Sequence, residues 1–76
     1  MSIKSYAILH SPIYGVESEL IDVEKSNIFG LQMRCRLNGH RGLKLYGFNL
    51  TEEMAKQVDL NNTEMVNLLL SKAEVL

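Results

Sequence analysis

The spacing of apolar residues changes once along this chain, close to Thr51. Before that point, apolar residues form short runs or alternate with polar ones, which is typical of β-strands. After it, they recur at the spacing of a helix with one buried face. Strands first and helices last indicate the α+β class. We therefore predict one small domain over residues 1–76, with an antiparallel sheet of about four strands followed by two C-terminal helices packed on one face.

Two strands are predicted in the N-terminal third. The first covers Ile3–His10 and ends at Ser11-Pro12, because proline lacks an amide donor and favours extended backbone in the residue before it. The second covers Val16–Lys25, where apolar residues are interspersed with acids. Such a strand is half exposed, and its outer face is acidic through Glu17, Glu19, Asp22 and Glu24.

A β-hairpin is predicted in the middle of the chain. From Leu31 to Leu37 the odd positions are apolar and the even ones polar, and the pattern resumes at Leu43 after the turn sequence 38–42. A register that pairs Leu37 with Leu43 places both leucine rows on one face. The other face then carries Arg34, Arg36, Lys44, Tyr46 and Phe48, with His40 and Arg41 at the tip.

The charges of the chain are strongly polarised. No Asp or Glu occurs between Lys25 and Thr51, although this window holds Lys25, Arg34, Arg36, Arg41 and Lys44, five of the eight basic residues. The window therefore sums to +5, and the remainder, nine acids less Lys4, Lys56 and Lys72, sums to −6. A chain with a net charge of only −1 can thus present one basic surface.

The predicted hairpin face has two interpretations. Exposed Tyr46 and Phe48 among cations would suit single-stranded nucleic acid, because rings stack on bases while Arg and Lys neutralise phosphates. Alternatively, both rings lie beneath a helix and the cations form a solvated face. The partner is then either nucleic acid or an acidic protein surface. The acidic strand of another copy is one such surface, in which case the chain is a homo-oligomer.

The two predicted helices have recognisable starts. Thr51 precedes Glu52-Glu53, and Asn61 or Asn62 precedes the second helix. Residues 51–71 resemble the helix-turn-helix motif and are similar to the small helical domain near the N-terminus of bacterial translation initiation factor two. The matching positions are Ala55 as the small residue and Met54, Val58, Leu60, Met65 and Leu68 as apolar contacts.

The resemblance implies nucleic-acid binding, with Asn62, Thr63 and Asn67 exposed on the second helix. The second helix contains no Arg or Lys before Lys72 to meet phosphates. A purely structural helical hairpin is therefore the alternative for this segment.

Nothing in the sequence points to catalysis, a cofactor or a metal. Cys35 is the single cysteine, and with two distant histidines it cannot complete the usual four-ligand zinc site. Its alternating position predicts burial as a small apolar residue. No apolar run approaches the roughly 20 residues that span a bilayer. We therefore expect a non-enzymatic binding or regulatory module that is cytoplasmic, has no cofactor and does not contact membranes.

Overall fold

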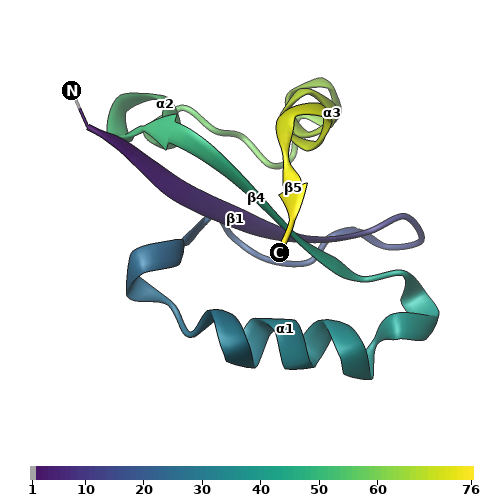
Figure 1. Cartoon of the computed structure of the whole chain (residues 1–76). Coiled ribbons are helices and arrows are strands. Elements are labelled where there is room, and N and C mark those ends of the chain that lie inside the picture. The colour runs from purple at the N-terminus through teal and green to yellow at the C-terminus, as the bar shows by residue number, and fades with distance from the viewer. Residues whose placement is uncertain (1) are drawn as a thin grey trace.

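The computed structural model describes residues 2–76 and shows an α+β fold, with a five-stranded antiparallel sheet and three α-helices. The sheet forms a middle layer, with α1 on one face and α2 and α3 on the other (Figure 1). The elements in chain order are β1 (Ile3–Ser11), β2 (Gly15–Val16), β3 (Ile21–Asp22), the 3₁₀ helix η1 (Val23–Lys25), α1 (Ile28–Leu37), the 3₁₀ helix η2 (Gly39–Arg41), β4 (Lys44–Thr51), α2 (Glu52–Lys56), α3 (Thr63–Lys72) and β5 (Glu74–Val75).

The centre of the sheet is the antiparallel pair of long strands β1 and β4. Their register runs from Ile3 opposite Thr51 to His10 opposite Lys44. Because side chains alternate along a strand, this pair builds two separate cores. Tyr6, Ile8, Phe48 and Leu50 pack with Leu69 of α3, while Ala7, Leu9, Leu43 and Leu45 pack beneath α1. The strands predicted over 3–10 and 43–48 are therefore confirmed.

The predicted acidic strand over 16–25 is instead a broken sheet edge. β2 and β3 both pair with β1, and η1 follows directly. Between them, the Glu17 amide donates to the Leu9 carbonyl at 2.8 Å, and the Leu9 amide donates to Ser18 Oγ at 2.9 Å. The ladder stops there because a side-chain hydroxyl replaces a backbone carbonyl as acceptor. The segment is half-buried, as predicted, but it is not continuous.

The largest correction concerns residues 28–37, which form α1 and not a strand. Asn27 Oδ1 accepts from the Gly30 amide at 3.1 Å and caps the start of the helix, and Asn38 follows its last residue as the C-cap. Ile28, Leu31 and Cys35, spaced at i, i+3 and i+7, pack against the Leu9 and Leu45 core. The predicted hairpin is therefore absent, and its place beside β4 is taken by β1 and by β5.

The two C-terminal helices lie where the sequence places them, with α2 shorter than predicted. Thr51 Oγ1 accepts from the Met54 amide and Asn62 Oδ1 from the Met65 amide, both at 3.2 Å, so the expected caps form. Both helices contribute to the core on one face of the sheet. After α3 the chain returns to the sheet as β5, which pairs with Tyr46 and Gly47. No helix within residues 2–76 is long and apolar enough to cross a membrane.

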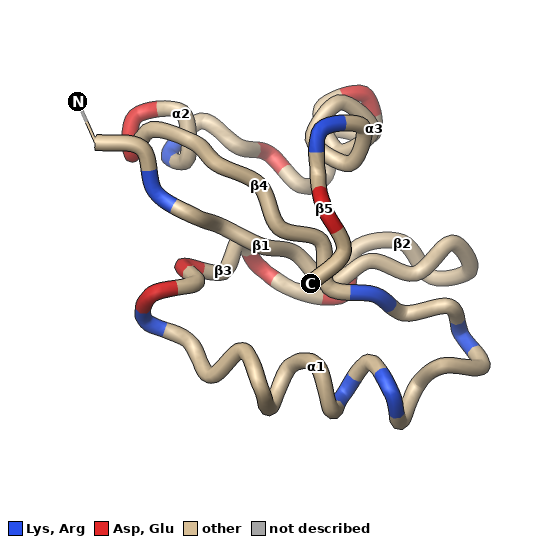
Figure 2. The backbone as a smooth tube through the Cα atoms, in the orientation of Figure 1, with Lys and Arg blue, Asp and Glu red and all other residues tan. Residues whose placement is uncertain are grey.

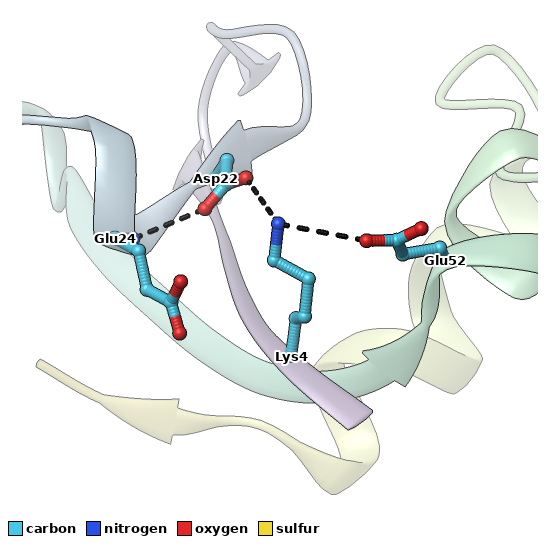
Figure 3. Close-up of polar contacts among 4 residues, drawn as sticks. All are labelled: Lys4, Asp22, Glu24 and Glu52. Atoms are coloured by element: carbon cyan, nitrogen blue, oxygen red, sulfur yellow. Dashed lines mark hydrogen bonds and ion pairs between the residues drawn. The ribbon is translucent and has the colours of Figure 1, made fainter. Parts of the chain in front are cut away.

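An ion pair joins β1 to the broken edge (Figure 3). Lys4 Nζ lies 2.9 Å from Asp22 Oδ2 and 3.9 Å from Glu52 Oε1, and the side chains of Lys4 and Asp22 are only 18% and 22% exposed. Asp22 Oδ1 also accepts from the Glu24 amide and caps η1. The hydrogen bond with Lys4 holds the pKa of Asp22 below its ordinary value, and the same bond raises the pKa of Lys4.

The ion pair of Lys4 with Asp22 should stop stabilising the folded protein in strong acid and in strong base. Because the pKa of Asp22 is lowered in the folded protein, its carboxylate stabilises the fold at pH values above the pKa of Asp in the unfolded chain, about 3.9. This stabilisation is lost as the pH falls through the pKa of Asp22 in the folded protein. The raised pKa of Lys4 means that stabilisation is lost as the pH rises beyond about 10.4.

Urea unfolding of Asp22→Asn and of the unmodified chain, followed across pH, tests this prediction. The amide oxygen of Asn can still cap η1, so the substitution isolates the charge. We expect the substituted chain to be less stable at neutral pH and the difference to vanish in strong acid. Glu19→Gln, an exposed acid in no ion pair among residues 2–76, is the control. A difference for Asp22→Asn that does not change with pH would contradict the prediction.

Candidate interaction surface

The residues predicted to share one hairpin face are divided between three elements. Arg34 and Arg36 occupy the last turn of α1, and Lys44 opens β4. The predicted register, with Leu37 opposite Leu43, does not form, because residues 28–37 are helical. The actual places of the predicted residues are α1 for Arg34 and Arg36, η2 for His40 and Arg41, and β4 for Lys44, Tyr46 and Phe48.

The two aromatic residues of the predicted face do not form an exposed platform. Phe48 is 8% exposed and belongs to the core beneath α3. Tyr46 is half-buried against that core, and its ring forms a T-shaped pair with the His10 ring at a centroid distance of 5.9 Å. The interpretation in which these rings lie beneath a helix therefore agrees with the structure.

The basic residues of the predicted face and its tip nevertheless gather at one end of the molecule, from the last turn of α1 to the start of β4 (Figure 2). Ser11 joins this end to the loop after β1. Its buried hydroxyl donates to the Arg41 carbonyl at 2.6 Å and accepts from the Ile13 and Tyr14 amides. The Arg41 guanidinium lies 5.1 Å from the centroid of the exposed Tyr14 ring, a cation–π contact. The loop and η2 thus form one unit.

The outward face of α1 carries an uncovered apolar stripe. Phe29, Met33 and Leu37 are spaced at i, i+4 and i+8, and Phe29 and Leu37 are 72% and 76% exposed. At about 100° per residue, this stripe lies opposite the row that packs on the sheet. α1 is therefore apolar on two opposite faces and has a partner within the chain on only one. In the sequence, this stripe is visible as a row of apolar residues at i, i+4 and i+8 that alternates with the half-buried row of Leu31 and Cys35.

Positive charge borders the stripe on both sides. Counted from Met33 at about 100° per residue, Arg34 falls on one side and Arg36 on the other. No acid occurs in α1, and none occurs from there to the start of β4. The outer face of α1, defined here as Phe29, Met33, Leu37, Arg34 and Arg36, is thus apolar in the middle and cationic at its rim.

A second apolar surface lies on the other side of the sheet. α2, α3 and β4 enclose a groove of about 170 Å³. The exposed fractions of Met54 and Leu68 at its edge are 54% and 58%, whereas Leu50 and Leu69 are buried. We call this surface the α2–α3 groove, and it is lined by Leu50, Met54, Gln57, Val58, Met65, Leu68 and Leu69.

Three acids are sequence neighbours of residues that line the α2–α3 groove. Glu53 precedes the lining residue Met54, Asp59 follows Val58, and Glu64 precedes Met65. The Asp59 amide donates to Met65 Sδ at 3.1 Å, which ties the connecting loop to the groove wall. Residues 51–71 hold four acids, Glu52, Glu53, Asp59 and Glu64, and one base, Lys56, so they sum to −3.

The α2–α3 segment departs from helix-turn-helix geometry. Asn62, Thr63 and Asn67 are exposed, as the resemblance requires. However, α2 has only five residues, and residues 57–62 separate it from α3, whereas the motif joins its helices by a turn of about three to four residues.

Reactive chemistry is sparse on this surface. Cys35 lies partly buried on the sheet side of α1, and burial raises the pKa of its thiol. A raised pKa keeps the thiol protonated and poorly nucleophilic. No group of three or more His, Cys, Asp or Glu residues in the described part of the chain could hold a metal ion.

No protein-family model, no curated protein and no solved structure matches this chain.

Proposed function

We propose that this protein is a small non-enzymatic interaction module that binds an acidic protein surface through the outer face of α1. The observation that carries the proposal is the uncovered stripe of Phe29, Met33 and Leu37 between two arginines. Large apolar side chains grouped on a surface and rimmed by polar ones are typical of protein-binding sites. The absence of acids from α1 to the start of β4 selects for a partner with negative charge.

The same face fits a protein better than a nucleic acid. Binding of single strands needs exposed rings among the cations, and Phe48 is buried beneath α3. The middle of the α1 face is aliphatic except for Phe29. Tyr14, exposed beside Arg41, favours nucleic acid as the competing candidate. A direct comparison of the two ligands separates these candidates.

Fluorescence anisotropy with defined probes tests the proposal. The probes are an amphipathic peptide with leucines on one helical face and glutamates on the other, a matched peptide with lysines in place of the glutamates, and single-stranded DNA. We expect the acidic peptide to bind most tightly and to weaken as salt is added. Phe29→Ser with Leu37→Ser should weaken it by about tenfold or more, because buried apolar anchors dominate such interfaces.

Ile3→Ser is the matched control, since Ile3 is comparably exposed, at 71%, and lies outside the α1 face. We expect no change in peptide affinity for that variant. The proposal fails if the acidic peptide does not bind at low salt, or if the Phe29 and Leu37 substitutions leave its affinity unchanged. Tighter binding of DNA than of the acidic peptide would replace this proposal by the nucleic-acid one.

A further inference from the structure

We propose that the partner is a second copy of this chain, with the outer face of α1 of one molecule docked in the α2–α3 groove of the next. This inference rests on the proposed function and identifies its partner. This small chain has two uncovered apolar surfaces, the outer face of α1 and the α2–α3 groove. The first is a helix face with positive charge at its rim, and the second is a groove in an acidic segment, so the two are complementary. A domain of this size buries a smaller share of its surface on folding than a larger domain does, so association adds to a thin core.

The apolar parts of the two surfaces match in size. The groove of about 170 Å³ has a buried floor of Leu50 and Leu69 and exposed edges at Met54 and Leu68. A cavity of about 150 Å³ accepts benzene, so the groove can take the Phe29 ring. The unbranched side chains of Met54 and Met65 can adjust around it. Met33 and Leu37 then lie along the same row, over the groove edge.

The charges of the two surfaces are opposite. Residues 28–44 sum to +4 through Arg34, Arg36, Arg41 and Lys44, and residues 51–71 sum to −3. Docking α1 in the groove brings its two flanking arginines to the acidic segment 51–71 of the partner, which contains Glu53, Asp59 and Glu64. Contact between two α1 faces would instead bring four arginines together, which opposes a symmetric dimer through α1.

The two surfaces lie on opposite faces of the sheet, with α1 on one side and α2 and α3 on the other (Figure 1). A contact between them is therefore heterologous: each molecule offers its α1 face to one neighbour and its groove to another. Such contacts build rings when the rotation closes and open filaments when it does not. Assembly should accordingly extend beyond a dimer as the protein concentration rises.

Sedimentation velocity over protein concentrations from about 1 µM to about 1 mM tests the inference. We expect the unmodified chain to form species larger than a dimer at the upper end and to dissociate in high salt. Phe29→Ser with Leu37→Ser removes the α1 face, and Leu68→Lys places a cation in the groove. Each variant alone should sediment as a monomer, while Ile3→Ser should assemble like the unmodified chain. Circular dichroism checks that every variant is folded.

Mixing the two variants gives the decisive result. The Leu68→Lys chain keeps its α1 face and the Phe29 and Leu37 variant keeps its groove, so together they should form a 1:1 dimer that cannot grow. A symmetric contact through α1 would instead leave Leu68→Lys dimeric on its own, and that result would overturn the inference. An unmodified chain that stays monomeric throughout, or variants that remain monomeric when mixed, would overturn it as well.

These failures differ from a failure of the proposed function. A monomeric chain that still binds the acidic peptide through Phe29 and Leu37 keeps the function and loses only the second copy as partner. Peptide affinity that stays unchanged in the Phe29→Ser with Leu37→Ser variant would instead reject the α1 face as the binding surface, and the second copy as its partner would fall with it.

Discussion

Leu45→Ala is expected to lower the free energy of unfolding by about 2–5 kcal/mol, because removing buried methyl groups forfeits their transfer free energy and leaves a cavity. Leu45 is 1% exposed and packs with Leu9 and Leu43 in the core beneath α1. A domain of this length has roughly 4–11 kcal/mol of stability in total. The substitution therefore removes a large share of that total and can leave much of the protein unfolded.

Leu37→Ala is the matched control for this prediction, since the same side chain is removed from a site that is 76% exposed. Alanine also has high helix propensity, so the change at the end of α1 should stay within about 0.5 kcal/mol. Urea unfolding followed by circular dichroism measures both variants. Equal stabilities of the two would show that the α1-side core is not closed around Leu45.

The central strands could be predicted because their alternation is enforced by two cores. Leu43 and Leu45 face one core, while Tyr46 and Phe48 face the other, as the odd and even positions indicate. The partner of β4 could not be predicted. Tyr6 pairs with Phe48 although all of α1 lies between them in the sequence. No local feature of β1 or β4 specifies that each pairs with the other.

The second half of α1 has the residue pattern of a strand for a physical reason. Leu31 and Cys35 form one i, i+4 row facing the sheet, and Met33 and Leu37 form another facing solvent. Two such rows offset by two residues produce the strict alternation of a strand. The capping residue Asn27, the adjacent apolar pair Ile28-Phe29 and the end at Asn38 are the signals that favour a helix over 28–37.

The candidate surface was predicted in its charge but not in its shape. Four of the five basic residues in the acid-free window do lie between the last turn of α1 and the start of β4, at one end of the molecule, whereas Lys25 lies in η1, before the other end of α1 (Figure 2). The strand predicted over 31–37, however, places Tyr46 and Phe48 beside the arginines and does not include Phe29. With a strand at this position, the aromatic residues of the surface are Tyr46 and Phe48, which favour nucleic acid. With the helix, the aromatic residue is Phe29, and the surface favours a protein.

Ser11→Ala is expected to cost about 1–3 kcal/mol, because buried groups that lose a hydrogen-bond partner bear the cost of desolvation. Ser11 is fully buried, and its hydroxyl serves the Arg41 carbonyl and the Ile13 and Tyr14 amides at once. These bonds hold the loop after β1 against η2. Without them, the Ile13 and Tyr14 amides should exchange with deuterium faster, and the contact between Arg41 and Tyr14 should loosen.

Ser71→Ala separates burial from the hydrogen bond itself. The Ser71 hydroxyl donates to the Leu68 carbonyl at 2.6 Å, the same length as the Ser11 bond to Arg41, but Ser71 is exposed. Water can replace its hydroxyl, so the change should stay within about 0.5 kcal/mol. Chemical unfolding and amide exchange measure both variants. Equal losses would mean that burial does not set the cost at Ser11, and unchanged exchange at Ile13 and Tyr14 would mean that Ser11 does not hold the basic end together.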